Sequence, residues 1–336
     1  MGVSADTLLR LSDLTVDFAS QEGTVHAVDR VSFSVAPGEL IGLVGESGCG
    51  KSVTASAIIG LTGMIANATV SGEIEFCGRD LLSLPESEVR RVRGRDIAMI
   101  FQDPVTSLNP VLSIERLMTE GLELHLSMSH AEAVRRSVEL LGEVGIPKAA
   151  GRIKDYPHQF SGGMRQRVMI AIALSCNPRL LLADEPTTAL DVTIQAQILR
   201  LLKKLSREHE AAVIVITHDL GVVAGMCQRI LVMYAGRIVE SGPAKALFER
   251  PHHPYTVGLL RSVPRLNRPR AETLETIAGL PPDLAHLPPG CSFAPRCYLQ
   301  QDACWQTMPE LAPTDPGRAS ACLRAQLLRE REEATA

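Results

Sequence analysis

A glycine-rich loop followed by lysine and serine is the first feature of this chain that could do chemistry. The pattern G-x-x-x-x-G-K-[ST], which cradles nucleotide phosphates, is matched by Gly45-Glu46-Ser47-Gly48-Cys49-Gly50-Lys51-Ser52. The glycines let successive backbone N–H groups point at the phosphates, and a following helix adds the positive end of its dipole. Lys51 would neutralise the β- and γ-phosphates, and the Ser52 hydroxyl would bind Mg²⁺. We therefore expect an ATP site whose contacts are Gly45, Ser47, Gly48, Cys49, Gly50, Lys51, Ser52 and Val53; a chance glycine-rich turn is the alternative.

Two adjacent acids at the end of an apolar run form the second candidate group. The run Leu180-Leu181-Leu182-Ala183 predicts a buried strand that ends at Asp184 and Glu185. Open α/β sheets bind their ligands at the carboxyl ends of the strands. Asp184 suits coordination of Mg²⁺ through water, and Glu185 suits a general base that polarises the attacking water. Taken alone, such a run is more often a strand that meets solvent, so the assignment depends on the phosphate loop upstream.

These groups need a scaffold, which the apolar patterns predict. Strands are expected over residues 8–18, 31–35, 39–44, 97–101, 180–183 and 213–217. Helices are expected over residues 52–61, 164–175 and 194–209, with helical periodicity from Ser113 to about Ala150. Alternating units of this kind favour an α/β core with a largely parallel sheet. From Pro251 to Ala336 frequent prolines predict a loop-rich accessory region.

The composition is that of an ordinary globular protein, and it narrows the classes of function. The 336 residues are 45% hydrophobic and 21% charged, which suits one sizeable core with an appendage. A formal net charge of −4 gives no overall positive field for nucleic acid or an anionic bilayer. The first ten residues do not resemble a secretory signal, and no apolar run reaches the roughly 18–20 residues that span a bilayer. We expect any membrane association to go through a partner protein.

A third motif, Ser161-Gly162-Gly163-Met164-Arg165-Gln166, separates this chain from other phosphate-loop proteins. It resembles the signature of the ABC ATPase family, and the resemblance extends over roughly Leu8 to Pro254. In that family the signature starts a helix and binds the γ-phosphate of ATP held by the opposing subunit. This implies that Ser161, Gly162 and Gly163 act in trans, through N–H groups at a helix start. A plain helix cap is the alternative.

The remaining positions of the family occur in the expected order. The resemblance assigns Gln102 to Mg²⁺, to the attacking water and to coupling with the membrane subunit. It assigns Asp191, which ends Ala189-Leu190-Asp191, to the dimer seam, and His218 to the γ-phosphate. Phe18 is the best candidate to stack on adenine and His26 is the runner-up, although a phenylalanine at this place could equally belong to the core.

Finer features resemble the importer branch for di- and oligopeptides, or for nickel. They are Phe101 to Pro110, Tyr156 to Phe160, Thr187 to Thr193, His253 to Thr256, and Gly279 to Pro282. The resemblance implies an ATPase at the cytoplasmic face of the cell membrane that closes around two ATP molecules as a dimer. It also implies two integral membrane permease subunits, a second ABC ATPase, identical or different, and a substrate-binding protein. The cargo stays open among dipeptides, oligopeptides, nickel, a glutathione-like peptide and an opine, because the ATPase does not normally contact it.

The predicted architecture is an ABC-type P-loop NTPase core of the α/β class. It combines a β-rich N-terminal subdomain, a helical signature subdomain and a loop-rich C-terminal extension that contains cysteines. The boundaries follow from the motifs and from the change in composition. The nucleotide-binding domain is assigned to residues 1–250, with the helical subdomain at about 103–175, and the extension to residues 251–336.

Four of the eight cysteines crowd the extension and need their own explanation. Cys291, Cys297, Cys304 and Cys322 offer four soft ligands, but their spacing lacks the tight C-x₂₋₄-C pair typical of zinc. Four thiolates can hold a [4Fe–4S] cluster, and the extension resembles that of peptide-importer ATPases in which such a cluster fits. Zn²⁺, unligated thiols and a disulfide remain as alternatives. Cys49, Cys77, Cys176 and Cys227 are expected to be small buried side chains.

A function from another class, a soluble ABC ATPase that acts on DNA or ribosomes, has one supporting feature. Arg90, Arg91, Arg93 and Arg95 form a basic cluster close to Gln102. Such clusters are usually a solvated face, and the acidic net charge argues against nucleic acid. No duplicated ATPase region and no long coiled coil accompany the cluster. The transporter interpretation therefore leads, with no nucleic-acid partner expected.

Overall fold

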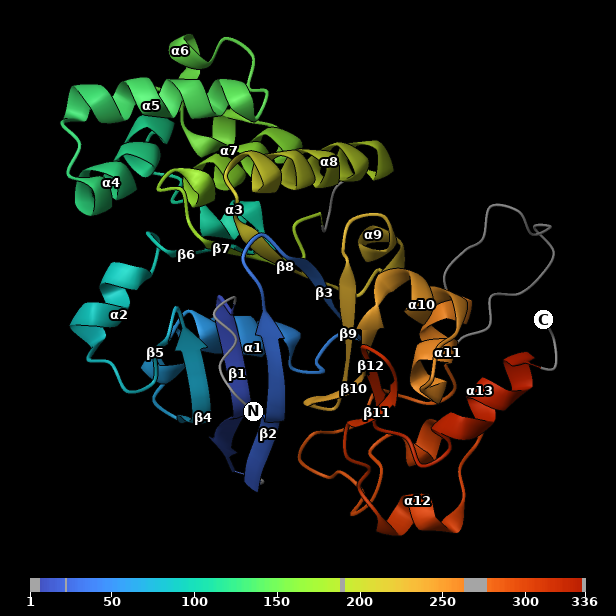
Figure 1. The fold of residues 1–336 in the computed structure, drawn as a ribbon. Helices are drawn as coiled ribbons and strands as arrows, with labels where there is room; N and C mark the ends of the chain where they lie inside the picture. The colour runs from blue at the N-terminus through green and yellow to red at the C-terminus, as the bar shows by residue number, and fades with distance from the viewer. Residues whose placement is uncertain (1–6, 22, 188–190, 263–276, 334–336) are drawn as a thin grey trace. The chain divides into compact units, whose positions relative to one another are not determined.

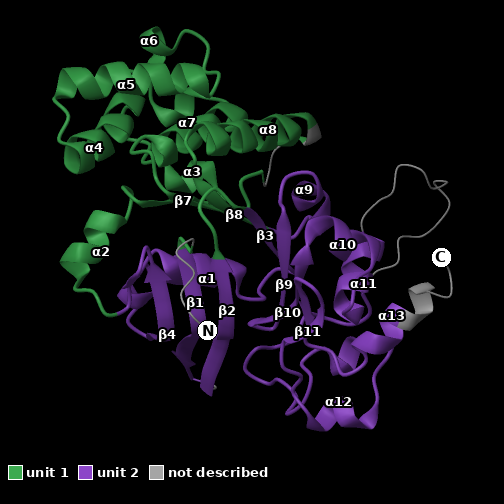
Figure 2. Ribbon diagram, in the orientation of Figure 1, with its two compact units in different colours: residues 1–8, 35–39, 83–216 green, residues 9–34, 40–82, 217–336 purple. Residues whose placement is uncertain are grey.

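The computed structural model describes residues 7–21, 23–187, 191–262 and 277–333. Its chain divides into two compact units that alternate along the sequence, shown in different colours in Figure 2. Unit 1 comprises residues 1–8, 35–39 and 83–216, and unit 2 comprises residues 9–34, 40–82 and 217–336. Each unit therefore contains segments that are distant in sequence, and each contains β-strands.

Three parallel strands form the β-structure of unit 1. They are β6 (Ile97–Ile100), β7 (Leu180–Asp184) and β8 (Ala212–Thr217), and β7 pairs with both others. Every residue of β7 and β8 is buried, as expected for parallel strands that read as continuous apolar runs. The three strands predicted in this part of the sequence are confirmed. Glu185 and His218 directly follow β7 and β8 in the chain, and Gln102 lies two residues after the end of β6.

The helices of unit 1 confirm the predicted helical insert. They are α2 (Glu86–Val92), α3 (Pro104–Ser107), α4 (Ile114–Leu126), α5 (His130–Glu143), α6 (Ala149–Arg152), η2 (Pro157–Gln159), α7 (Gly162–Leu174) and α8 (Val192–Glu208). In Figure 1 α4 and α5 lie side by side next to α7. Ser129 begins α5 with a reciprocal capping box, in which its side chain and that of Glu132 each bond the other's backbone N–H.

Unit 2 opens with an antiparallel sheet, which confirms the β-rich N-terminal region. Its strands β1 (Leu9–Ser20), β2 (Gly23–Val35), β4 (Ala68–Phe76) and β5 (Arg79–Asp80) follow the order β2-β1-β4-β5. Helix α1 (Lys51–Ile58) and the short η1 (Thr62–Met64) belong to the same unit. The helix expected to reach Leu61 ends at Ile58, because Gly60 adopts a positive φ of 75° and the Leu61 N–H turns back to the Ser56 carbonyl oxygen.

A second set of strands in unit 2 joins the core to the C-terminal region. In spatial order they are β3 (Leu40–Val44), β9 (Arg229–Tyr234), β10 (Arg237–Pro243), β12 (Arg318–Ser320) and β11 (Ala312–Asp315). Strands β3 and β9 are parallel, which agrees with the expected sheet, and the other neighbours are antiparallel. Strands β4, β5, β9 and β10 and the β11–β12 hairpin were not predicted from the sequence. The hairpin adds residues of the proline-rich region to an edge of a core strand.

The C-terminal region is built from short elements, as its prolines predict. Besides the hairpin it contains α11 (Pro254–Ser262), η3 (Ala294–Arg296), α12 (Asp302–Gln306) and α13 (Ala325–Glu333). Helices α9 (Leu220–Ala224) and α10 (Ala244–Glu249) precede it in the chain. Over the part of the chain that the structure describes, no helix has both the length and the apolar character that a membrane span requires.

Candidate nucleotide site and cysteine centre

The phosphate loop joins β3 to α1 in unit 2, and its lysine bonds the backbone of the loop. The Lys51 Nζ donates to the carbonyl oxygens of Gly45 (2.9 Å) and Glu46 (2.8 Å), so the ammonium group is held against the start of the loop. Gly50 has φ = +104°, and a Cβ there would collide with the Ala27 carbonyl oxygen. Glycine at this position is therefore required for two reasons, conformation and space. Ser52 and Val53 follow Lys51 in the first turn of α1, whose N-terminus joins the loop.

The two acids occupy the end of β7 in unit 1. Asp184 and Glu185 are both buried, and Glu185 has φ = +44°, in the left-handed region that a non-glycine residue rarely adopts. Such strain is typical of residues that the surrounding structure holds in place for function. The Gln102 Nε2 donates to the Glu185 Oε2 at 2.7 Å. Two of the predicted catalytic residues, 83 positions apart, are thus brought together.

The signature motif lies at the start of α7. Ser161 is the N-cap residue, and its Oγ accepts a hydrogen bond from the Met164 N–H at 3.4 Å. Ser161 and Gly162 are exposed, and Gly163 is half-buried against α8, where an added Cβ would lie 3.0 Å from the Ile194 side chain. Within one chain, therefore, Ser161 acts as a helix cap. The first turn of α7 is exposed, so capping does not prevent it from also binding an anion.

The remaining predicted positions are distributed over both units. Asp191 caps α8 by accepting from the Ile194 N–H at 3.0 Å, whereas Thr188, Ala189 and Leu190 lie outside the described residues. His218 follows β8 and is exposed. Phe18 is half-buried on β1, and the imidazole of His26 bonds the neighbouring Asp17 at 2.7 Å. The phosphate loop, His218 and Phe18 belong to unit 2, whereas Gln102, the two acids and the signature belong to unit 1.

The four C-terminal cysteines, 31 residues apart at their extremes, converge on one small cavity. Cys291, Cys297, Cys304 and Cys322 all line it, together with apolar side chains such as Leu299 and Phe293. All eight cysteines of the chain are free thiols, so the disulfide alternative is not the bonding seen here. Of the other four, Cys49, Cys176 and Cys227 are buried as expected, but Cys77 is exposed at the β4–β5 turn, so burial does not explain it.

Electrostatics around the C-terminal thiols favour a cation if they ionise. Burial, followed by the charges of the other three thiolates, raises the pKa of Cys322 to about 12. Burial likewise raises the pKa values of Cys291 and Cys297, and neighbouring cysteines add to both shifts. Backbone N–H groups of Leu299 and Arg324 donate to the sulfurs of Cys297 and Cys322, each at 3.3 Å. No group of three or more His, Cys, Asp or Glu side chains within the described residues has the arrangement that holds a metal ion.

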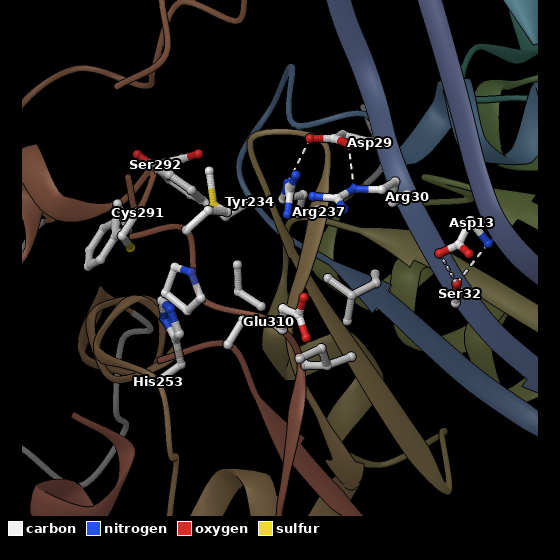
Figure 3. Close-up of a pocket in the computed structure, with 17 residues that line it drawn as sticks. Asp13, Asp29, Arg30, Ser32, Tyr234, Arg237, His253, Cys291, Ser292 and Glu310 are labelled. Carbon is white, nitrogen blue, oxygen red and sulfur yellow. Dashed lines mark hydrogen bonds and ion pairs between the residues drawn. The ribbon is translucent and has the colours of Figure 1, made fainter. Parts of the chain in front are cut away.

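A larger cavity of unit 2 lies beside this region (Figure 3). It has a volume of about 470 Å³ and is lined by residues of β1, β2, β9, β10 and the C-terminal region. Dashed lines in the figure mark the ion pairs of Asp29 with Arg237 and Arg30 on its wall. None of the predicted nucleotide residues lines this cavity, so it is distinct from the predicted ATP site.

One set of contacts to the phosphate loop was not predicted. The Glu46 side chain bonds Arg296, and the Glu46 N–H donates to the Tyr255 hydroxyl at 2.8 Å. Both partners come from the C-terminal region, 209 and 250 positions away. No local pattern signals such contacts, because the loop motif leaves the identity of its second residue free.

Comparison with known proteins places these motifs in a family. The family described as ABC transporter matches residues 28–188, and the family described as oligopeptide/dipeptide transporter, C-terminal region, matches residues 239–304. The oligopeptide transport ATP-binding protein OppD of Escherichia coli is 53% identical over 320 residues, which cover 95% of this chain and 94% of that protein. The protein of the same name from Haemophilus influenzae is 50% identical over 94% of this chain and 96% of its own length.

Solved structures agree with the sequence relatives. A dimeric ATP-binding cassette bound to ADP and Pi superposes with a TM-score of 0.63 and 29% identity, covering 70% of this chain and 98% of that chain. A cassette of the CbiONQ transporter complex from Clostridium perfringens gives a TM-score of 0.61 and 27% identity, covering 73% of this chain and 91% of that chain. The chain therefore belongs to the ABC transporter family, as an ATP-hydrolysing subunit whose C-terminal region is of the oligopeptide/dipeptide transporter type.

Proposed function

We propose that this subunit powers the uptake of di- and oligopeptides across the cytoplasmic membrane. One observation carries the assignment of cargo. The chain joins an ABC ATPase to the C-terminal region of the oligopeptide/dipeptide transporters, and it does so along nearly the full length of relatives that are named for oligopeptide transport. Nickel and other small solutes are outcomes of the test below.

In this proposal the phosphate loop and the two acids hold Mg-ATP. Gly45, Ser47, Gly48, Cys49 and Gly50 present backbone N–H groups to the phosphates, and Lys51 leaves its loop carbonyls to neutralise the β- and γ-phosphates. Ser52, Asp184 and Gln102 hold Mg²⁺ directly or through water. Val53 follows in the first turn of α1, and Phe18 stacks on adenine with His26 as the alternative.

Hydrolysis in this proposal depends on Glu185. Its carboxylate orients and deprotonates the water that attacks the γ-phosphorus. As the new O–P bond forms, the proton moves to the carboxylate, the bond between the γ-phosphorus and the β–γ bridging oxygen breaks, and ADP leaves with that oxygen. Gln102, which already donates to Glu185, fixes the direction of that carboxylate and senses the nucleotide. His218 contacts the γ-phosphate from the end of β8.

Dimer formation completes the site in this proposal. Ser161, Gly162 and Gly163 of one subunit face the γ-phosphate bound by the other, where the exposed first turn of α7 supplies N–H donors. Asp191 lies at the seam between the subunits. The dimeric state of the related cassette bound to ADP and Pi supports this arrangement.

Exposed apolar side chains in unit 1 support a contact with membrane subunits. Phe101, Val105 and Tyr156 are large, apolar and exposed, and they lie in segments next to Gln102 or before the signature. Exposed apolar side chains of this kind mark protein interfaces when they cluster. We propose two permease subunits and a second ATPase as partners, fed by a substrate-binding protein. The subunit would then lie peripherally at the cytoplasmic face, with a nucleotide-binding domain over residues 1–250, a helical subdomain at about 103–175 and an extension over residues 251–336.

We further propose that the four C-terminal cysteines hold a [4Fe–4S] cluster, with Zn²⁺ as the alternative. The fit rests on convergence of all four thiols on one cavity and on backbone N–H donors to their sulfurs. A cluster spreads four thiolates over four irons, so they need not meet at one point as the ligands of a single ion do. When bound, it would cross-link the loop-rich extension. Anaerobically purified protein should contain iron and acid-labile sulfide, and both should be lost in Cys322→Ser but retained in the control Cys77→Ser. Zinc without sulfide would favour the zinc alternative. Metal-free protein whose four thiols are freely alkylated would contradict both proposals.

Co-purification tests the transporter assignment. A tagged chain is expressed in its native host, the membranes are solubilised in mild detergent, and the associated proteins are identified by mass spectrometry. We expect two polytopic permease subunits and a related ATPase. Uptake of labelled di- and oligopeptides should then depend on the complex and fail with Glu185→Gln, whereas uptake of nickel alone would change the cargo. Recovery from the soluble fraction with nucleic acid or ribosomal proteins would contradict the transporter assignment.

A further inference from the structure

Glu46, the second residue of the phosphate loop, is bonded to residues of the C-terminal region. The guanidinium of Arg296 binds the Glu46 carboxylate through two parallel hydrogen bonds, Nη1 to Oε2 at 2.6 Å and Nη2 to Oε1 at 3.0 Å. The side chain of Arg296 is 5% exposed and that of Glu46 is 24% exposed. A bidentate pair shielded from water fixes direction as well as distance, and it is less screened than a surface pair.

A second contact fixes the backbone of the same residue. The Glu46 N–H donates to the hydroxyl of Tyr255, a fully buried residue of α11. The Tyr255 ring packs on Tyr234 and Phe293, with ring centroids 4.6 and 5.4 Å away. Because this aromatic cluster is buried and closely packed, the hydroxyl is a rigid acceptor.

Glu46 in turn holds the phosphate-binding lysine. Its carbonyl oxygen accepts from the Lys51 Nζ at 2.8 Å. The side chain, the N–H and the carbonyl of one residue are therefore bonded to Arg296, Tyr255 and Lys51. The N–H and carbonyl belong to the two peptide groups that flank Glu46, so a shift of either C-terminal contact moves the anchor of the lysine.

Charge gives the Arg296 contact a second role. The Glu46 carboxylate sits in a loop built for anions, where an uncompensated negative charge would repel the phosphates of ATP. Arg296 neutralises it at close range. Removing the arginine therefore leaves a repulsive charge in the loop, which is worse than removing both charges.

We propose that Arg296 and Tyr255 are positioning residues that set the phosphate loop for ATP, so that the C-terminal region of this subunit tunes its nucleotide affinity. The contact also links the loop to the cysteine centre. Arg296 is the last residue of the single turn η3, which lies between Cys291 and Cys297. The N–H groups of Ala294, Arg296 and Cys297 donate to the carbonyl oxygens three residues earlier, those of Cys291, Phe293 and Ala294. Whatever fixes those two cysteines also fixes the arginine. The proposal depends on the ATPase activity but not on the cargo or on the bound metal.

The test is a set of variants in the purified ATPase, read as affinity for a fluorescent ATP analogue and as separate kcat and KM values. Arg296→Ala should weaken nucleotide binding about tenfold, the effect of a lost charge-assisted pair, and leave kcat at saturating ATP within about twofold. Arg296→Lys should fall between, because an ammonium cannot reproduce the fork. Tyr255→Phe, which keeps the packing, should weaken binding about threefold.

Rescue by Glu46→Gln separates positioning from general damage. In the Arg296→Ala background it removes the uncompensated carboxylate, so affinity should recover by at least half of the lost factor, and the loss itself should shrink at high salt. The matched control is Arg329→Ala, which removes another arginine–carboxylate pair of the C-terminal region, with Asp315 at 2.8 Å, and should leave affinity unchanged. Unchanged ATP affinity in both Arg296→Ala and Tyr255→Phe would overturn the proposal. So would an Arg296→Ala defect that Glu46→Gln does not relieve, including one caused by unfolding of the region.

Discussion

The contacts made within the phosphate loop span a few residues, whereas those that anchor the C-terminal region span many. In the loop, Lys51 bonds residues five and six positions earlier, and the Thr54 N–H bonds Gly50. In the C-terminal region the buried Glu240 of β10 accepts from the N–H groups of His252 and His253 and from Arg318, 78 positions away. Contacts of the first kind join residues that are close in the sequence, whereas contacts of the second kind join distant residues and form only when the chain folds. The nucleotide motifs should therefore control chemistry, and the anchor around Glu240, unlike the contacts of Arg296 and Tyr255 with the loop, should control stability.

The largest expected effect belongs to the chemistry. Glu185→Gln keeps the size of the side chain but removes the base, so ATP turnover should fall by about 10³-fold, within the range for a lost general base. Nucleotide affinity and the melting temperature should stay nearly unchanged. Phosphate release and a nucleotide titration measure the two quantities. The control is Glu208→Gln on α8, which removes a carboxylate paired with Lys204 on the surface; equal turnover in the two variants would remove Glu185 from the role of base.

The same division explains how much could be predicted from sequence. The strands at Ile97, Leu180 and Val213 were predictable because parallel buried strands are uninterrupted apolar runs. The loop at Gly45 was predictable because its glycines and lysine determine their own conformation. The β11–β12 hairpin was not predicted because Pro313 and Gly317 are residue types that disfavour strands. Pairing of β12 with β10 and with β11 nevertheless forms the hairpin, since tertiary contacts outweigh local strand propensity.

The candidate site divides along the same line. The sequence supplied Gln102 and Glu185 as separate family positions, and folding placed them 2.7 Å apart. It could not supply Arg296, because a salt bridge across 250 positions leaves no periodic or local pattern. It also grouped by crowding alone the four cysteines that line one cavity, but it left open whether they bind a cluster, zinc or no ligand.

The next largest effect concerns the anchor of the C-terminal region. Side chains of Arg318 and Glu240 are only 5% and 1% exposed, so Arg318→Leu would leave a buried carboxylate without its cation. We expect the free energy of unfolding to fall by about 3–4 kcal/mol, with kcat of the remaining folded protein unchanged. Denaturant unfolding measures the loss. Arg329→Leu, at an exposed pair, should cost less than about 1 kcal/mol, and adding Glu240→Gln to Arg318→Leu should restore part of the stability.

Acid should weaken the same anchor. Burial, followed by the charge of Arg318 and partly opposed by Asp315, lowers the pKa of His252 to about 4. Arg329 and Arg250 also face the ring, and Thr314 bonds it at 2.8 Å. As the pH falls, His252 is therefore protonated near pH 6.5 in the unfolded chain but only near pH 4 in the folded protein. Stability should fall as the pH drops through this window, by up to about 3 kcal/mol.

Unfolding at a series of pH values measures this slope. His252→Gln should make it shallower, because an amide can keep a hydrogen bond to Thr314 without titrating. The adjacent His253, whose pKa burial lowers to about 3, should keep the rest of the slope. His286→Gln is the matched control, since His286 is exposed and bonds Asp283 across one turn. An unchanged slope in His252→Gln would contradict the assignment of the acid sensitivity to this residue.

The smallest effect decides between a structural and a functional role at the start of α8. Asp191 caps the helix, so Asp191→Ala should cost about 1 kcal/mol and lower the melting temperature by roughly 2–4 °C. Asn caps as well as Asp does, so Asp191→Asn should restore the melting temperature while it removes the charge. If Asp191 only caps, the Asn variant should also regain ATP turnover and its cooperative dependence on ATP. If the charge organises the dimer seam, turnover should stay low in both variants, although Asp191→Asn is fully stable. Comparison of ATPase assays with thermal melts would then assign Asp191 to chemistry rather than to the fold.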